Sequence, residues 1–141
     1  MQFNLVGNLF AAAQAALSGN RLAEAESLCR QALQLNPREP ACLFLMGVIA
    51  GSAGQPAAAL GFFNQVVALD PNLAEAHENR GIALANLGRS DEAEAAFRRA
   101  IALAPGRAES WRALGNLKSR QGDEEAAQEA FGKAQALRPP A

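Results

Sequence analysis

The chain has 141 residues, half of them hydrophobic, and its 13 basic and 14 acidic side chains nearly cancel. No field of one sign is large enough to indicate binding to nucleic acid or to an anionic membrane surface. The longest apolar run, Cys42–Ala50, has nine residues, whereas a membrane-spanning helix needs about 20, so we expect no membrane insertion.

Prolines recur along the chain at a constant spacing of 34 residues, at Pro37, Pro71, Pro105 and Pro139. A fixed period of this length is typical of repeat architectures, in which each repeat is one supersecondary unit. The period predicts a single domain, residues 1–141, built from four repeats: 6–39, 40–73, 74–107 and 108–141.

Each repeat predicts two helices joined by a turn. The first helix covers about fourteen positions and ends near a glycine that can adopt a positive φ; these glycines are Gly19, Gly54, Gly88 and Gly122. The second helix runs to the proline, which ends it because it lacks an N–H donor and restricts the preceding residue. No apolar alternation of period two is present, so the sequence predicts an all-α chain with eight helices.

Two of the second helices begin with start signals. Pro56 lies in the first turn expected for the second repeat, where a missing N–H costs little. In the third repeat, Ser90 is the expected N-cap, and Asp91 and Glu92 place negative charge where the helix macrodipole favours it.

Equivalent positions in the four repeats show which residues are fixed by packing. The eighth position is small and reads Ala13, Gly47, Gly81 and Gly115. The twenty-fourth position reads Cys29, Phe63, Phe97 and Phe131. Small residues let antiparallel helices approach closely, and the larger residue is expected to fill the space between one helix pair and the next.

This arrangement resembles the tetratricopeptide repeat. The last repeat carries most of the pattern, with Trp111, Leu114-Gly115, Ala127, Phe131, Ala134 and Pro139. The first repeat departs from it most, since Ala12-Ala13 replaces Leu-Gly and Cys29 replaces the bulky aromatic residue. The resemblance covers residues 6–141 and implies an α-solenoid, a right-handed superhelix of four helix-turn-helix repeats.

The resemblance also implies a function. Proteins of this family are interaction scaffolds or adaptors, which bind a partner peptide or helix in a concave groove lined by the first helices. It places on that face Phe10, Gln14, Leu17, Phe44, Leu45, Val48, Glu75, Glu78, Asn79, Ile82, Arg112 and Asn116. Because the first half of this set is apolar and the second half polar, we expect an apolar stretch of the partner to be anchored by the first half and oriented by the second.

Parts of this surface have structural alternatives. Phe10 and Phe44 could instead pack on each other or beneath Met1–Leu5, and Glu78 and Arg112 could form an ion pair between neighbouring helices. The clamp with which some family members hold the C-terminal carboxylate of chaperone tails is missing, because Phe10 and Gln14 occupy the matching positions.

Nothing in the sequence indicates catalysis, a cofactor or a metal site. His77 is the single histidine and occupies a packing position, and no Cys–His pair, Ser–His–Asp set or phosphate-binding loop can be assembled. Cys29 and Cys42 lack metal-ligand spacing, which predicts buried, reduced thiols and a cytoplasmic location, with the periplasm as the alternative.

Other functions stay open at this point. The chain could be the N-terminal module of a larger protein, since such arrays can precede transferase domains, or a structural or oligomerisation element without a peptide ligand. Gln135 stands where the earlier repeats have Leu33, Val67 and Ile101, so the last helix is expected to face water. Exposed ends of the array could also meet in a homodimer.

Overall fold

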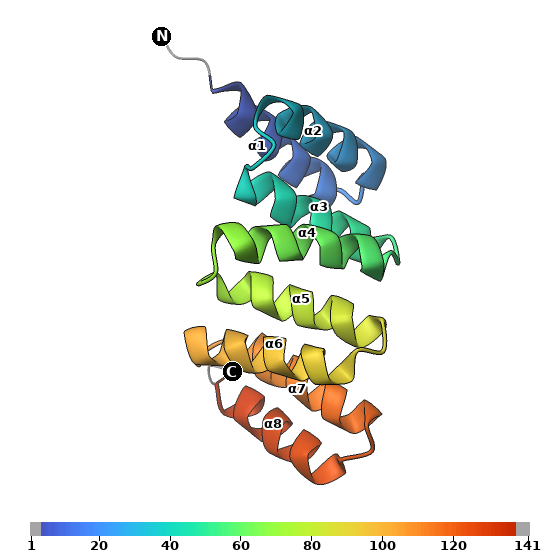
Figure 1. Ribbon diagram of the computed structural model, residues 1–141, viewed down its shortest axis with the longest axis vertical. Coiled ribbons are helices and arrows are strands. Elements are labelled where there is room, and N and C mark those ends of the chain that lie inside the picture. Colours follow the sequence, from blue (N-terminus) through green and yellow to red (C-terminus); the bar gives the residue numbers. More distant parts are fainter. Residues whose placement is uncertain (1–3, 138–141) are drawn as a thin grey trace. The chain divides into compact units, whose positions relative to one another are not determined.

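The computed structural model describes residues 4–137 and contains eight α-helices and no strand over that range (Figure 1). The helices are α1 Leu5–Ser18, α2 Leu22–Leu35, α3 Pro40–Ser52, α4 Pro56–Leu69, α5 Ala74–Asn86, α6 Ser90–Leu103, α7 Ala108–Arg120 and α8 Glu124–Ala136. Two helices in each repeat confirm the expected all-α architecture. The proline that closes the last repeat, Pro139, lies outside the described residues.

Contacts between helices divide the chain into two compact units, Met1–Pro71 and Asn72–Ala141, here called unit 1 and unit 2. Each unit holds two repeats. In unit 1, α1 pairs with α2 and α3 pairs with α4, and the two hairpins meet through α2 and α3. Unit 2 has the same order, with α6 and α7 joining its two hairpins.

The first helices of each unit lie together. In unit 1, α1 contacts α3, and in unit 2, α5 contacts α7. The second helices of a unit do not contact each other within the described residues. In each unit the two first helices therefore lie side by side, and all of the predicted site residues belong to these helices.

The turns inside the repeats use one left-handed residue each. Gly54, Gly88 and Gly122 have φ of 73°, 77° and 81°, a conformation that glycine adopts without steric cost. In the first repeat the left-handed residue is Asn20, with φ of 59°, while Gly19 has φ of −85°. The expectation for Gly19 is therefore wrong by one position, because the short polar side chain of asparagine also tolerates this conformation.

Helix starts follow the expected signals in part. Pro56 opens α4 as expected, and Asp91 and Glu92 lie in the first turn of α6. Ser90, however, is already helical, and the residue before it has no capping side chain, so the N-cap expected at Ser90 is wrong. Side-chain caps are formed elsewhere, by Asn4 on the amide of Gly7 at 2.9 Å and by Asp123 on the amide of Ala126 at 3.1 Å.

In each of the last three hairpins, a phenylalanine ring of the second helix packs directly against a glycine of the first helix. A methyl group added to Gly81 would lie 2.5 Å from Cε1 of Phe97. The same addition at Gly47 or Gly115 would lie 2.6 Å from the ring of Phe63 or Phe131. Each ring thus packs on the first helix of its own repeat, and any side chain at the eighth position would displace it.

The first hairpin solves the same packing problem differently. Its eighth position is Ala13 and its twenty-fourth is Cys29, and both are fully buried. The methyl group of alanine occupies space that a phenyl ring needs in the other repeats, and the smaller cysteine side chain makes room for it. The residue at the eighth position is larger than in the other repeats and the residue at the twenty-fourth is smaller, so α1 and α2 stay in close contact.

Replacing Gly115 by alanine is expected to lower the free energy of unfolding by about 1–3 kcal/mol, because the added methyl group overpacks against Phe131. Gly132→Ala in α8 is the matched control, since no atom lies within 4 Å of its added methyl group. In this variant, alanine restricts the conformations of the unfolded chain, so the free energy of unfolding should rise by about 0.5–1 kcal/mol. Urea unfolding followed by circular dichroism measures both changes, and equal effects would contradict this packing.

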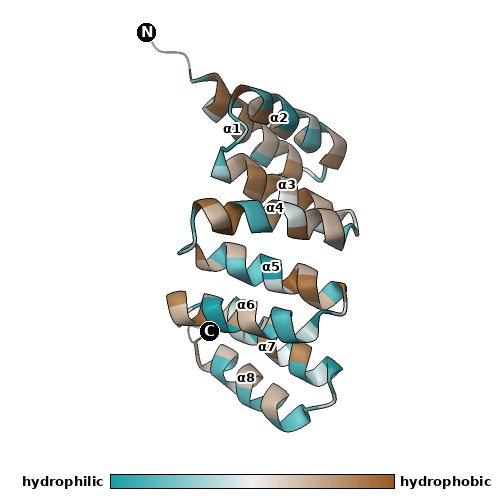
Figure 2. Ribbon diagram, in the orientation of Figure 1, coloured by the Kyte–Doolittle hydropathy of each residue, from teal (hydrophilic) through white to brown (hydrophobic). Residues whose placement is uncertain are grey.

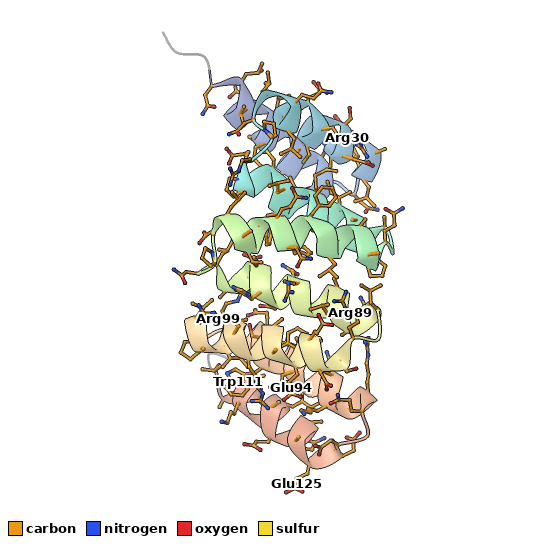
Figure 3. The ribbon with its side chains drawn as sticks, in the orientation of Figure 1. Arg30, Arg89, Glu94, Arg99, Trp111 and Glu125 are labelled. Carbon is orange, nitrogen blue, oxygen red and sulfur yellow. The ribbon has the colours of Figure 1, made fainter. Side chains whose placement is uncertain are left out.

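A partly buried ion pair connects the two hairpins of unit 2. Lys118 Nζ on α7 donates to Glu94 Oε1 on α6 at 2.6 Å, and Arg98 Nε donates to the other carboxylate oxygen at 2.9 Å. Figure 3 marks Glu94 on α6. Hydrogen bonds from Lys118 and from Arg98 hold the pKa of the Glu94 carboxyl below its ordinary value of 4.5.

Stability from this pair is fully present above pH 4.5 and is lost as the pH falls through the lowered folded-state pKa of Glu94. Glu94→Gln should therefore lower the free energy of unfolding by roughly 1 kcal/mol at neutral pH and by much less in acid. Glu129→Gln is the control, because this carboxylate forms no ion pair in the described part of the chain. Urea unfolding at several pH values would reject the assignment if the Glu94→Gln difference stayed constant.

Trp111 on α7 is the one tryptophan of the chain, and it lies half-buried in unit 2 (Figure 3). Its indole Nε1 donates to the carbonyl oxygen of Pro105 at 3.3 Å. The ammonium group of Lys133 on α8 lies 4.7 Å from the ring centroid, within the range of a cation–π interaction. The indole therefore joins the loop before α7 to the last helix.

Candidate functional site

The first helices of unit 1 form an uncharged surface. No acidic or basic residue occurs in residues 4–20 or 40–55, which contain α1 and α3. Figure 2 shows hydrophobic colouring along most of both helices. Of the predicted site residues here, Gln14 is exposed and Phe10, Leu17, Phe44 and Val48 are half-buried. Such a surface suits contact with an apolar segment of another protein.

Leu45 differs from the other predicted residues of unit 1. It is 6% exposed and belongs to the core cluster that also contains Met46 and Ile49 on α3. Phe10 and Leu17 pack against the same cluster with part of their surface. Leu45 therefore supports the surface from beneath, and little of its side chain can reach a partner.

The ring of Phe44 packs against Phe63 of α4, edge to face, with centroids 5.6 Å apart. This is the favoured geometry for two aromatic rings. In the alternative where Phe10 and Phe44 pack on each other, the two rings would pair, but no such ring pair occurs within the described residues, and Phe10 packs against the core cluster of unit 1. The other alternative, burial beneath Met1–Leu5, falls largely outside them.

The first helices of unit 2 line an open cavity of about 350 Å³. Helix α5 contributes Glu78, Ile82, Ala85 and Asn86, and α7 contributes Glu109, Arg112, Ala113, Asn116, Leu117 and Arg120. The Phe97 ring forms part of its wall. The size is that of a small ligand or of a few side chains from a partner segment.

Four predicted site residues are brought together in this cavity, namely Glu78, Ile82, Arg112 and Asn116. Glu75 and Asn79 lie on α5 but do not line it. Besides Ala85, Phe97, Glu109, Ala113 and Leu117, the lining holds Asn86 and Arg120, which are also absent from the predicted set. Each stands four residues after a predicted residue, Ile82 or Asn116, so the helical periodicity alone could have found them.

Glu78 is held by two groups from the start of α7. Arg107 donates to Glu78 Oε2 through Nε at 3.2 Å and Nη2 at 2.9 Å, and Ser110 Oγ donates to the same oxygen at 3.0 Å. The hydrogen bond to Glu78 raises the pKa of Arg107. The alternative in which Glu78 forms an ion pair with Arg112 is not found among the described residues, because Arg107 reaches the buried carboxylate from the loop between α6 and α7.

Ser110→Ala removes a donor from a carboxylate that is only 7% exposed. We expect the free energy of unfolding to fall by about 1.5–3 kcal/mol, the usual range for a hydrogen bond to a charged group. Ser119→Ala is the control on the same helix, since that hydroxyl bonds Glu124 at an exposed site, and its effect should stay within about 0.5 kcal/mol. Thermal unfolding compares the variants, and two equal losses would contradict the role of Ser110.

Arg112 and Arg120 are the exposed cations of the cavity. Neither forms an ion pair within residues 4–137. A guanidinium group presents five N–H donors in a planar fork that suits a carboxylate. Both side chains can therefore bind an acidic group without first breaking an internal contact.

The described residues contain no group of three His, Cys, Asp or Glu side chains placed to hold a metal ion. Cys29 and Cys42 are free and fully buried, and burial raises the pKa of both thiols, that of Cys29 to about 11. A thiol with a raised pKa is a poor nucleophile near neutral pH. No helix in residues 4–137 is long and apolar enough to cross a bilayer.

Comparisons with known proteins agree with this architecture. Residues 44–108 match a family model described as tetratricopeptide repeat, and residues 6–39 and 108–140 match a second model with the same description. A search of curated protein sequences finds no match.

Several solved structures resemble the chain. MamA from residue 41 to its end, from Desulfovibrio magneticus RS-1, aligns with a TM-score of 0.86 and 23% identity over 94% of this chain and 75% of that one. A crystal structure of MamA aligns with a TM-score of 0.84 and 19% identity over 94% and 77%. At such low identity the likeness concerns the fold alone.

Proposed function

The chain belongs to the tetratricopeptide repeat family, and on this premise we propose that its first helices hold a segment of a partner protein. Repeats of this family mediate protein–protein interactions, so the protein is an interaction scaffold. The proposal concerns where and how it binds. The observation that carries it is the cavity between α5 and α7, which gathers Ile82, Arg112 and Asn116 from the two first helices of unit 2.

Two kinds of surface support binding of a protein segment. In unit 1, α1 and α3 offer uncharged side chains with half-buried Phe10 and Phe44. In unit 2, α5 and α7 offer polar groups around Ile82, which is 40% exposed. Apolar anchors supply most of the affinity in such interfaces, and polar groups fix the register and direction of the bound segment.

Binding without catalysis fits the chemistry of these surfaces. The polar groups of the cavity in unit 2 are amides, guanidinium groups and carboxylates, and His77 does not line it. Two free, fully buried thiols are suited to a reducing compartment such as the cytoplasm.

Ile82→Lys tests the proposed surface. Peptides selected from a displayed random library on the purified protein should bind this variant at least about tenfold more weakly, because the charge replaces an apolar anchor. Leu87→Lys is the matched control, since Leu87 is 37% exposed at the end of α5 and does not line the cavity. Fluorescence polarisation gives the dissociation constants. Peptides that bind both variants as tightly as the parent protein would overturn the proposal.

A second candidate is assembly through exposed terminal helices. Leu5 at the start of α1 and Leu137 at the end of α8 are among the few large exposed hydrophobic residues. Gln135 is exposed, while Leu33 and Ile101 at equivalent positions are half-buried, so α8 presents a more polar surface than α2 and α6. The polar α8 argues against a large apolar interface there, and a monomeric mass in solution would remove this candidate.

A further inference from the structure

The cavity in unit 2 is bordered by two matching ridges of side chains. On α5 the ridge is Glu78, Ile82 and Asn86, and on α7 it is Arg112, Asn116 and Arg120. Residues four apart lie on one face of a helix, and α5 contacts α7. Each pair across the cavity occupies the same position in successive repeats, so Ile82 and Asn116 mark its middle.

Charge along these ridges is not balanced. The carboxylate of Glu78 is already matched by Arg107 and Ser110. Arg112 and Arg120 have no ion pair in the described part of the chain, and Glu109 is the one other carboxylate of the lining. Two uncompensated cations against one anion favour an acidic ligand, although the whole chain carries a formal charge of −1.

The spacing of the two arginines defines a sequence pattern. Arg112 and Arg120 are separated by eight residues of one α-helix, which is about 12 Å along its axis. An extended chain advances about 3.4 Å per residue and places alternate side chains on the same side. Two acidic residues four positions apart therefore match the arginines, and the residue midway between them faces the cavity near Ile82.

We propose that the α5–α7 cavity binds an extended segment of a partner protein with the pattern acidic–any–apolar–any–acidic. This rests on the proposed function and names the class of partner for the same surface. The two carboxylates pair with Arg112 and Arg120, and the central apolar side chain lies against the exposed side chain of Ile82. The segment is internal to its chain, because both anchoring charges are side chains and no terminal carboxylate is required.

The test uses a fluorescein-labelled peptide with an amidated C-terminus, Gly-Glu-Ser-Leu-Ser-Glu-Gly, and fluorescence polarisation. Arg112→Gln and Arg120→Gln should each weaken binding about fivefold, the upper range for an exposed ion pair. Glu109→Gln should instead tighten binding, by up to about twofold, because it removes the remaining negative charge. Arg99→Gln on α6 (Figure 3) is the matched control, because Arg99 is exposed and does not line the cavity, and its loss should leave binding unchanged.

Two further peptides separate the possible failures. The first is Gly-Gln-Ser-Leu-Ser-Gln-Gly, and the second has lysine in place of each glutamine. If either peptide binds as tightly as the acidic peptide, and its binding is lost in Ile82→Lys, the preference for acidic residues is overturned. The proposed function is then still supported. The inference and the proposed function both fail if no peptide, selected or designed, binds in a manner that depends on Ile82. Unchanged binding to the Arg112→Gln/Arg120→Gln double variant also overturns the inference, and circular dichroism verifies that each variant is folded. Weaker binding of the acidic peptide as sodium chloride rises from about 50 to 300 mM supports it.

Discussion

Contact between a phenyl ring and a bare glycine backbone determines how closely the two helices of a repeat approach. The rings of Phe63, Phe97 and Phe131 fill space that any side chain on the facing helix would occupy. With Ala13 and Cys29 the first repeat keeps the same closeness by exchanging volume between the two positions. Because each hairpin is fixed internally in this way, the outer faces of its first helix can vary in sequence without loss of the fold.

That freedom gives the first helices of the two units different surfaces, although both units have the same arrangement of helices. The first helices of unit 1 carry no charge, and those of unit 2 carry guanidinium, amide and carboxylate groups around Ile82. In unit 2 one of these carboxylates, that of Glu78, is already paired within the protein, because it accepts hydrogen bonds from Arg107 and Ser110. Arg112 and Arg120 have no internal ion pair among the described residues, and the proposed preference for an acidic ligand depends on them.

Most of the fold followed from the period of the sequence, because small residues and prolines recur wherever helices must pack or end. The site followed less well. A spacing argument put Glu78 opposite Arg112, but Arg107 comes from an irregular loop whose path no periodicity describes. Likewise, the left-handed residue of the first repeat is Asn20, because asparagine can substitute for glycine and shift the apparent register by one. The burial of Leu45 comes from its packing in one core cluster with residues of α1 and α2, and its position along α3 alone does not indicate those contacts.

The two cysteines and the tryptophan are divided between the units in a useful way. Cys29 and Cys42 both lie in unit 1 and are shielded from solvent, whereas Trp111 lies in unit 2 between Pro105 and Lys133. A thiol reagent can reach the cysteines only when unit 1 opens, and indole fluorescence responds to the surroundings of α7 and α8. The native chain thus carries a separate reporter in each half, and comparing labelling rates with emission would show whether the halves unfold as one cooperative body or in succession.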